Sequence, residues 1–220
     1  MHVKKIIFPL LLIILVSQSV STLEWKYIDI DLALSWKNNA QIGNEASGKQ
    51  PSILTFNPGV SFFADFDAEN GEWYFRPGAW LSWGNEEVYK GVARPTGEEI
   101  AGHMKVLGLI ADAHFGYLFP LPKLDIGVQG GPSFSLKFPL WTAQMGTGEP
   151  AEFWRAYYGR AQFLSVSFAS WAAIELNEST DFMAGLRLHL PMSNLWTAAP
   201  IGHAIMVSIV GSFRFPLTGG

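Results

Sequence analysis

The chain has 220 residues, 49% of them hydrophobic and only 15% charged, so it is too apolar to be intrinsically disordered. Its formal net charge of −4 offers no positive field to attract phosphates, which argues against nucleic acid as a partner. Cysteine is absent, which removes disulfides, thiolate nucleophiles and any metal or lipid attachment through cysteine. The 9 tryptophans, 22 glycines and 14% aromatic content are unusual for a soluble enzyme.

The N-terminal residues resemble an export signal. Two lysines precede an apolar run at 6–16, and Ser19 and Ser21 fit the small-x-small pattern of a cleavage site. The run is far shorter than the roughly 20 residues of a spanning helix, so we expect a cleaved signal peptide rather than an anchor. We therefore divide the chain into a signal peptide at 1–21, a barrel region at 22–216 and a C-terminal tail at 217–220.

Alternation of apolar and polar residues organises the rest of the chain. Every second residue from Ile28 to Trp36 is apolar, while Asp29 and Asp31 lie between them, as in a strand with two chemically different faces. Ordinary strands have about five or six residues, whereas a tilted strand that crosses a bilayer needs about 9 to 11. The pattern predicts eight strands of the longer kind, at residues 25–36, 53–67, 72–84, 104–119, 123–138, 162–176, 180–190 and 203–215.

The predicted connections alternate between tight turns and long loops. Residues 68–71, 120–122 and 177–179 have the Asn, Gly and Pro content of turns, and the other connections are much longer. Short turns at one rim, long loops at the other and an even strand number are typical of bacterial outer-membrane proteins. We predict an all-β fold, an eight-stranded antiparallel up-and-down transmembrane β-barrel with short periplasmic turns and long extracellular loops, in the outer membrane of a diderm bacterium.

The outward face of these strands is predicted to meet membrane lipids. We expect that face to lack Asp, Glu, Lys and Arg, because a lipid-facing Lys or Arg near the midplane costs about 2 to 4 kcal/mol. Aromatic residues should gather near the strand ends as an interfacial belt. Those near the tight turns are Phe66, Trp73, Phe75, Tyr117, Phe119, Phe182, Phe213 and Phe215, and those near the long loops are Trp36, Phe56, Trp83 and Phe138.

The last predicted strand carries the most specific signal. Residues 205–215 read IMVSIVGSFRF, alternate in polarity and end in an aromatic residue, and residues 113–117 read AHFGY next to a tight turn. In these segments the chain resembles the small eight-stranded outer-membrane proteins, the barrel domains similar to OmpA, OmpX and OmpW. The resemblance implies that the outer-membrane assembly machinery recognises the last strand. Residues 216–220 depart from the family pattern, in which the chain usually ends at the aromatic residue.

The inward face is predicted to carry many charged groups. An eight-stranded barrel is just wide enough to be filled by side chains, so these groups should pair with one another rather than line an open pore. This argues against a general diffusion porin. The predicted polar network of the lumen consists of Asp29, Asp31, Asp65, Arg76, Asp112, His114, Asp125, Gln129, Lys137, Glu175, Asp181, Arg187, His189 and Arg214.

A catalytic site inside the barrel is an alternative use of these groups. Asp112 and His114 share a face, and pairing across the turn at 177–179 sets His189 opposite Ser167, so an imidazole lies near a carboxylate or a hydroxyl. Lipid-modifying outer-membrane enzymes of an acyltransferase and a deacylase type resemble the chain in size, but the deacylase motif His-x-Ser is absent. The five histidines show no metal-ligand spacing. We expect no enzyme activity, no cofactor and no metal.

The long loops are expected to carry the function, because rigid barrels position the loops that meet the outside. The first two, roughly 37–52 and 85–103, are polar, whereas the third, at about 139–161, is rich in aromatic residues, and the fourth adds Trp196. These aromatic residues either contact an extracellular ligand or host factor, or fold over the mouth and pack on themselves. The candidate contact surface comprises Trp141, Phe153, Trp154, Tyr157, Tyr158 and Trp196.

We interpret the chain as a non-enzymatic barrel with a structural or surface-interaction role. A second interpretation is a narrow channel for small hydrophobic solutes, similar to OmpW. A third is a soluble barrel that binds lipid inside, but this interpretation would have to account for the apolar exterior. The channel would depend on the apolar inward residues, which are Val106, Ile110, Leu118, Met183, Met206 and Val210.

Overall fold

The computed structural model describes most of the predicted barrel region. Outside the described residues lie the signal peptide predicted at 1–21, the turn predicted at 68–71 and most of the tail. Within the described part, no helix is long and apolar enough to cross a membrane. The described residues are 23–38, 53–66, 73–89, 91–96, 104–140, 149–195 and 204–217.

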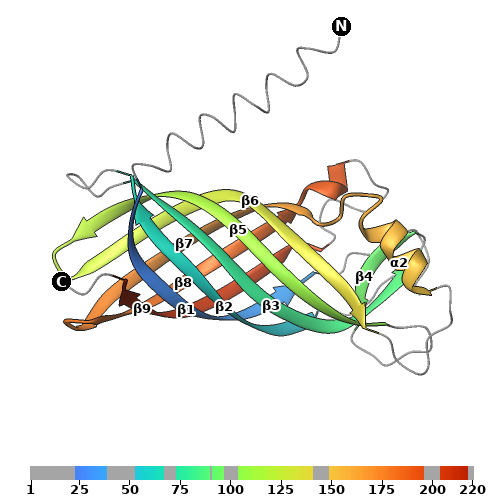
Figure 1. Cartoon of the computed structure of the whole chain (residues 1–220), viewed down its shortest axis with the longest axis horizontal. Coiled ribbons are helices and arrows are strands. Elements are labelled where there is room, and N and C mark those ends of the chain that lie inside the picture. Colours follow the sequence, from blue (N-terminus) through green and yellow to red (C-terminus); the bar gives the residue numbers. More distant parts are fainter. Residues whose placement is uncertain are drawn as a thin grey trace, which may run out of the picture.

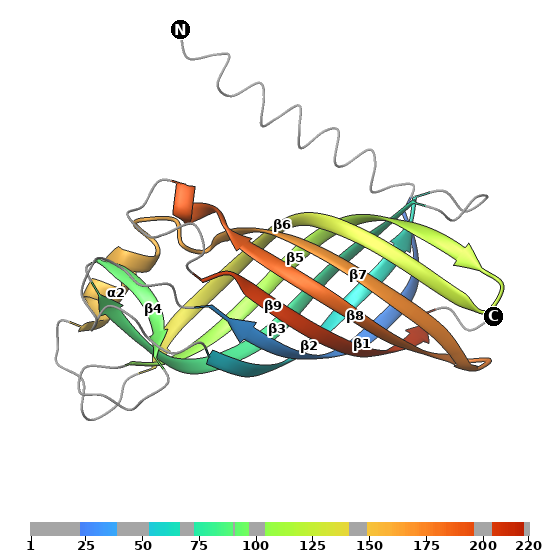
Figure 2. The same cartoon turned by 180° about the vertical axis from the view of Figure 1, so that it is seen from behind.

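Long antiparallel strands form a closed cylinder (Figures 1 and 2). Each barrel strand pairs with its neighbours in the chain, and β9 pairs with β1 to close the barrel. The predicted eight-stranded antiparallel barrel is therefore confirmed. The barrel strands are β1 (Glu24–Lys37), β2 (Ile53–Asp65), β3 (Trp73–Tyr89), β5 (Met104–Leu121), β6 (Leu124–Leu140), β7 (Leu164–Asn177), β8 (Thr180–Pro191) and β9 (Met206–Pro216). The smaller elements are β4 (Val92–Thr96), α2 (Glu149–Tyr157) and the 3-10 helix η2 (Met192–Leu195).

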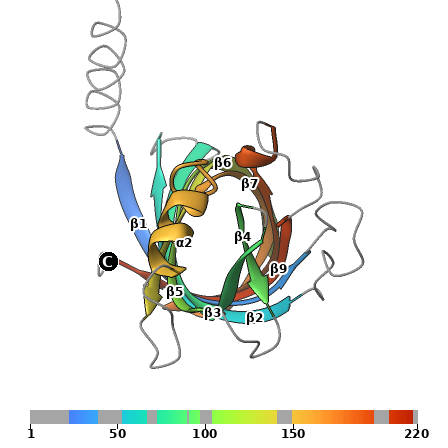
Figure 3. The same ribbon diagram turned by 90° about the vertical axis from the view of Figure 1, so that its right-hand side faces the viewer.

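The two ends of the barrel are built differently. Pro122 and Lys123 connect β5 to β6, and Glu178 and Ser179 connect β7 to β8, at or beside the predicted turns. These connections lie at the same end as the start of β1 and the end of β9, which we call the turn end (Figure 1). The opposite end, which we call the loop end, carries β4, α2 and η2. Viewed from the loop end, α2 lies along the rim and β4 stands in front of the opening (Figure 3).

One predicted loop is partly a strand hairpin. The third strand continues past residue 84, its predicted end, to Tyr89, which pairs with Val92 of β4. Gly91, with φ of 73°, supplies the left-handed backbone conformation of the turn. The prediction was wrong here because the glutamates at the end of this strand read as loop residues, although they continue the alternation of the strand.

The outer face of the barrel is apolar, as predicted for lipid contact. In β1, Leu32 is 47% exposed while the neighbouring Asp31 is 0% exposed, the reverse of the arrangement in a water-soluble protein. Charged side chains on the outside stand near strand ends, as Glu24 and Lys105 do. Lys105 is therefore an exception to the expectation that the outer face lacks charged residues. It lies at the loop end of β5, where its ammonium group can reach the membrane surface.

The predicted aromatic belt is present near both ends. At the turn end, Tyr117 contacts Trp73 and Phe119, with ring centroids 5.2 and 4.8 Å apart. Near the loop end of the barrel wall, Trp36, Phe56, Trp83 and Phe138 are exposed. Aromatic side chains are expected at these two levels of the barrel, because they favour the interfaces where the bilayer meets water.

We expect the substitution Leu186→Arg to destabilise the barrel by about 2 to 4 kcal/mol, because it places a guanidinium in lipid near the middle of β8. Leu186 is 57% exposed on the outer face. The matched control is Leu195→Arg in η2, which is 69% exposed but lies beyond the strand end. Urea unfolding in lipid vesicles measures the free energy of unfolding of both variants. Equal effects of the two substitutions would contradict a lipid-facing position for Leu186.

Glycines make room for large aromatic rings that lie over the neighbouring strand inside the barrel. A Cβ atom on Gly127 would lie 2.2 Å from the indole of Trp171, and one on Gly59 would lie 2.1 Å from the indole of Trp80. Real Cβ contacts are never this short, so each ring occupies the space that a side chain would need. The glycine content of the strands therefore follows in part from the packing of the barrel interior.

The substitution Gly127→Ala should cost about 1 to 3 kcal/mol of stability, because the indole of Trp171 must move within a filled interior. Gly211→Ala is the matched control, since its Cβ would have no atom within 4 Å. The midpoint temperature at which the folded gel band disappears compares the two variants. A Gly127→Ala protein as stable as Gly211→Ala would show that the indole is not held in this place.

Candidate functional site

The lumen is closed at its turn end by a cluster of aromatic side chains. The rings of Phe63 and Tyr74 stack with centroids 4.7 Å apart, and Trp171 packs edge-on against Phe63 at 6.3 Å. The guanidinium of Arg214 lies over this cluster, 4.4 Å from the centroid of Phe63 and 5.1 Å from that of Trp171. Cation–π contacts of this kind stabilise a desolvated charge.

Four buried charged residues form the centre of the lumen network. Arg214 and Arg76 donate to Asp29 through their Nε atoms at 2.8 and 2.9 Å. Arg76 also donates to Asp31 through Nη2 at 3.2 Å, and the hydroxyl of Ser61 donates to Asp31 at 2.8 Å. Two carboxylates thus balance two guanidiniums, and their remaining hydrogen-bonding capacity is used by neighbouring side chains.

The tautomer of His114 follows from its neighbours. The side-chain oxygen of Gln129 accepts from Trp171 Nε1 at 3.2 Å and from the Tyr74 hydroxyl at 3.0 Å, so its nitrogen faces His114 Nδ1, at 2.7 Å. An amide nitrogen only donates, which leaves Nδ1 without a proton and places the proton on Nε2. His114 Nε2 therefore donates to the hydroxyl oxygen of Ser167, at 2.5 Å.

A second histidine ends a chain of hydrogen bonds that begins at Asp112. The Ser133 hydroxyl donates to Asp112, because a carboxylate only accepts, so Ser133 accepts the Nδ1 proton of His189 at 3.2 Å. His189 Nε2 is then a lone-pair acceptor, and this buried atom has no hydrogen-bond partner in the described structure. Arg187 Nη1 lies 3.3 Å from Asp112, and its guanidinium stacks 3.6 Å from the ring of Trp80.

The predicted pair of His189 and Ser167 is only partly present. Their backbone positions lie opposite each other in the β7–β8 register, as expected. Their side chains bond elsewhere, however: Ser167 binds His114, on the far side of β6, and His189 binds Ser133, on the far side of β7. Strand register predicts neighbours within the sheet, whereas these contacts cross the curved lumen between strands that do not pair.

Four predicted members of the network lie outside it. Asp125, Glu175 and Asp181 line an open cavity at the turn end, together with Lys123. Asp65 lies in the same part of the barrel, where Lys26 Nζ is 3.7 Å from its carboxylate. These positions are in phase with the lumen, but they lie within three residues of a strand end. Solvent reaches Asp125, Glu175 and Asp181 there, and Asp65 pairs with Lys26 rather than with the central arginines. The prediction that these acidic residues belong to the lumen network was therefore wrong, and they form a rim of acidic residues at the turn end.

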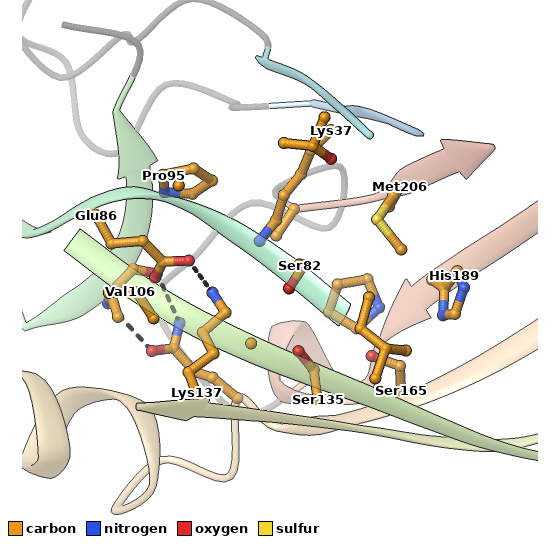
Figure 4. Close-up of a pocket in the computed structure, with 18 of the residues that line it drawn as sticks. Lys37, Ser82, Glu86, Pro95, Val106, Ser135, Lys137, Ser165, His189 and Met206 are labelled. Carbon is orange, nitrogen blue, oxygen red and sulfur yellow. Dashed lines mark hydrogen bonds and ion pairs between the residues drawn. The ribbon is translucent and has the colours of Figure 1, made fainter. Parts of the chain in front are cut away.

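Two further charged residues belong to the lumen and were missed. Glu86 forms an ion pair with Lys137 at the loop end, and Lys37 points into the same space (Figure 4). The sequence interpretation placed Glu86 in the loop at 85–103 and Lys37 in the loop at 37–52. Each residue continues the inward phase of its strand, and that phase is the signal that would have found them.

These residues surround a cavity that opens at the loop end and has a volume of about 120 Å³. His189 lies at its inner end, to the right of the charged groups in Figure 4, and Ser133 also lines the cavity. Hydroxyl and amide groups line one part of its wall and apolar side chains another. The polar lining includes Asn57, Ser82, Ser135 and Ser165, and the apolar lining includes Val106, Ile110 and Met206.

The third long loop forms a folded platform over this cavity. Phe153 and Tyr157 of α2 pack with Ala93 of β4 and Met104 of β5 in a buried cluster. The Tyr157 hydroxyl donates to the backbone oxygen of Ser135 at 2.6 Å, and burial raises the pKa of this phenol well above its ordinary value. The platform is therefore anchored to the barrel wall by both packing and hydrogen bonding.

The candidate contact surface is corrected accordingly. Phe153 and Tyr157 are buried and pack on the protein itself, because the helix turns that face toward the hairpin. Trp154 remains exposed and stacks on Tyr158, with ring centroids 4.6 Å apart. Trp141 and Trp196, the other predicted members, lie outside the described residues.

Comparison with known proteins identifies the fold. No family model matches the chain, and no curated protein matches it in sequence. The crystal structure of Neisserial surface protein A superimposes with a TM-score of 0.50 at 11% identity, over 86% of this chain and 96% of that one. The attachment invasion locus protein Ail of Yersinia pestis, solved in complex with the heparin analogue sucrose octasulfate, gives a TM-score of 0.46 at 10% identity, over 88% of this chain and 98% of that one. The chain thus has the fold of small eight-stranded outer-membrane β-barrels, which have periplasmic turns and extracellular loops.

Proposed function

We propose that the chain is a non-conducting barrel of the outer membrane that acts at the cell surface through its loop end, in a structural or surface-interaction role. The observation that carries this proposal is the unequal construction of the two ends. The described turn-end connections are two-residue turns, whereas the loop end holds α2 and β4 with a buried cluster of their own. A rigid platform presented to the outside is what a binding surface requires.

The exposed part of the platform centres on Trp154. Its ring is held by stacking on Tyr158, whose hydroxyl in turn donates to the Lys137 backbone oxygen at 2.8 Å. An exposed tryptophan with a fixed orientation loses little conformational entropy on binding, and tryptophan is enriched among the residues that dominate interfaces. The proposed partner is an extracellular ligand or host factor that contacts this side chain.

Binding of labelled extracellular-matrix proteins and glycans to cells that display the barrel tests the proposal. Wild-type cells should bind at least one of these probes more strongly than cells without the barrel, and Trp154→Ala should reduce that binding about tenfold or more. Lys123→Ala, an exposed substitution at the turn end, is the control and should leave binding unchanged. Wild-type binding no greater than that of the empty strain would contradict a surface-interaction role.

A channel for small hydrophobic solutes has less support. Five of the six apolar inward residues fall into two separate groups: Val106, Ile110 and Met206 line the loop-end cavity, while Leu118 and Met183 belong to the aromatic cluster at the turn end. The sixth, Val210, lies beside Arg76 and Arg187. The buried ion pairs lie between these groups. A hydrophobic solute would have to displace paired charges to pass, which costs several kcal/mol per ion.

A hydrolase also has less support, for a reason of proton placement. A serine nucleophile needs a base that takes its proton, yet the network around Gln129 makes His114 a donor to Ser167. His189 is an acceptor, but its Nδ1 neighbour is the Ser133 hydroxyl, whose proton is directed to Asp112. We expect expression of the barrel to leave lipid A composition the same as in an empty strain.

A further inference from the structure

The loop-end cavity combines several features that the surface role does not use. Near its opening at the loop end, two lysines face one glutamate. Lys137 is paired with Glu86, and Lys37 lies close enough for its charge to repel that of Lys137. Within the part of the chain that the structure describes, Lys37 forms no salt bridge. With both lysines protonated, the cavity carries one positive charge in excess and is suited to a ligand group with a single negative charge, which would also favour the protonated form of Lys37.

The inner end of the cavity requires a hydrogen-bond donor. His189 is 4% exposed, lines the cavity, and leaves its Nε2 atom without a partner. The hydrogen bonds through Ser133 to Asp112 hold the proton on Nδ1, so Nε2 can only accept while the ring is neutral. A buried acceptor without a partner costs about 1 to 3 kcal/mol, so a ligand hydroxyl that donates to it gains a favourable contact.

The wall between these two points is mixed in polarity. Hydroxyls of Ser82, Ser135 and Ser165 line it together with Val106 and Met206. The ring of a sugar has the same mixture, with hydroxyls at its edge and C–H groups on its faces. The volume of about 120 Å³ is below the roughly 300 to 1,000 Å³ of pockets for drug-sized ligands, so it suits one small ring rather than an acyl chain or an oligosaccharide.

We propose that this cavity binds a small sugar acid, a single hydroxylated ring with one carboxylate. The carboxylate would lie at Lys37 and Lys137, at the loop end, and a ring hydroxyl would donate to His189 Nε2, at the inner end. A carboxylate matches the single excess charge better than a phosphate monoester, which carries nearly two charges at pH 7. The inference does not depend on the Trp154 surface, which is a separate part of the platform.

Calorimetric titration of the intact barrel in detergent micelles with D-glucuronate tests the proposal. The wild type should bind glucuronate with a dissociation constant in the millimolar range. D-glucose lacks the carboxylate, cyclohexanecarboxylate lacks the hydroxyls, and glucose 6-phosphate carries the larger charge. Each should have a dissociation constant at least about tenfold higher than that of glucuronate. Glucose loses the charge-assisted hydrogen bonds to the lysines, cyclohexanecarboxylate loses the hydrogen bond to His189, and glucose 6-phosphate leaves a charge unmatched.

Two cavity variants and one control extend the test. Lys37→Met should weaken glucuronate binding about tenfold or more and leave glucose unchanged, whereas His189→Phe should weaken glucuronate and leave cyclohexanecarboxylate unchanged. Lys123→Met, at the turn end, should bind as the wild type does. The heat-dependent gel shift confirms that each variant is folded. The proposal is overturned if glucuronate does not bind the wild type, or if it binds no better than the three related solutes, a comparison that needs no variant.

Discussion

Replacing Asp29 by alanine should destabilise the barrel by about 3 to 5 kcal/mol, the range for breaking a buried ion pair from one side. Asp29 is completely buried and accepts hydrogen bonds from both Arg76 and Arg214. Without it, Asp31 alone would face two guanidiniums in an interior that water reaches poorly. The expected result is a lower urea midpoint for unfolding in detergent micelles, together with loss of the folded gel band at lower temperature.

Asp125→Ala is the matched control for this substitution. Asp125 was predicted in the same network from the same sequence pattern, but it lines the open cavity at the turn end, where an exposed charge contributes about 1 kcal/mol or less. The two substitutions remove the same group at different heights in the barrel. If Asp125→Ala costs as much as Asp29→Ala, the ion pairs at the centre do not hold the barrel closed.

Much of the fold could be predicted from the sequence because strand geometry has a period of two. In β1, the alternation places Asp29 and Asp31 inside and the leucines outside. Tight turns set the register of β5 with β6 and of β7 with β8. For this reason the opposition of His189 and Ser167 was correct at the level of the backbone. Lipid on the outside strengthens the pattern, since a one-residue slip would place carboxylates in the membrane.

The contacts across the lumen could not be predicted in the same way. The bond between His114 and Ser167 joins β5 to β7, which are separated by β6, and the direction in which its proton points depends on Gln129. Such contacts depend on barrel curvature and on rotamers, which alternation does not encode. Glu86 shows a different difficulty, because its charge suggested a loop, whereas its phase was that of a lumen residue.

The aromatic residues of the third loop show a limit of composition as a guide. Phe153 and Tyr157 lie on the face of α2 that packs against β4, and Trp154 lies on the exposed face. Helical spacing separates these two faces, but the expectation of a loop without helix treated all of them alike. A helical reading of 149–157 would have divided the contact surface correctly.

The wild-type barrel should show no steady ionic conductance in a planar lipid bilayer, because two layers block its lumen. Trp171 belongs to the aromatic layer, and Asp29 with Arg76 belongs to the ion-pair layer. The triple variant of these residues to alanine removes a ring and one charge of each sign, and it leaves Asp31 and Arg214 to balance each other.

The triple variant should therefore conduct ions, provided that the heat-dependent gel shift shows it to be folded. The contrast between wild type and variant is informative because the outer face and the strand pairing are unchanged, so insertion into the bilayer is the same for both. Steady conductance of the wild type would mean that water and ions pass the buried pairs, and the channel interpretation would then replace the surface role. Closure at the centre also explains why the cavity beneath α2 and β4 at the loop end is separate from the open cavity at the turn end.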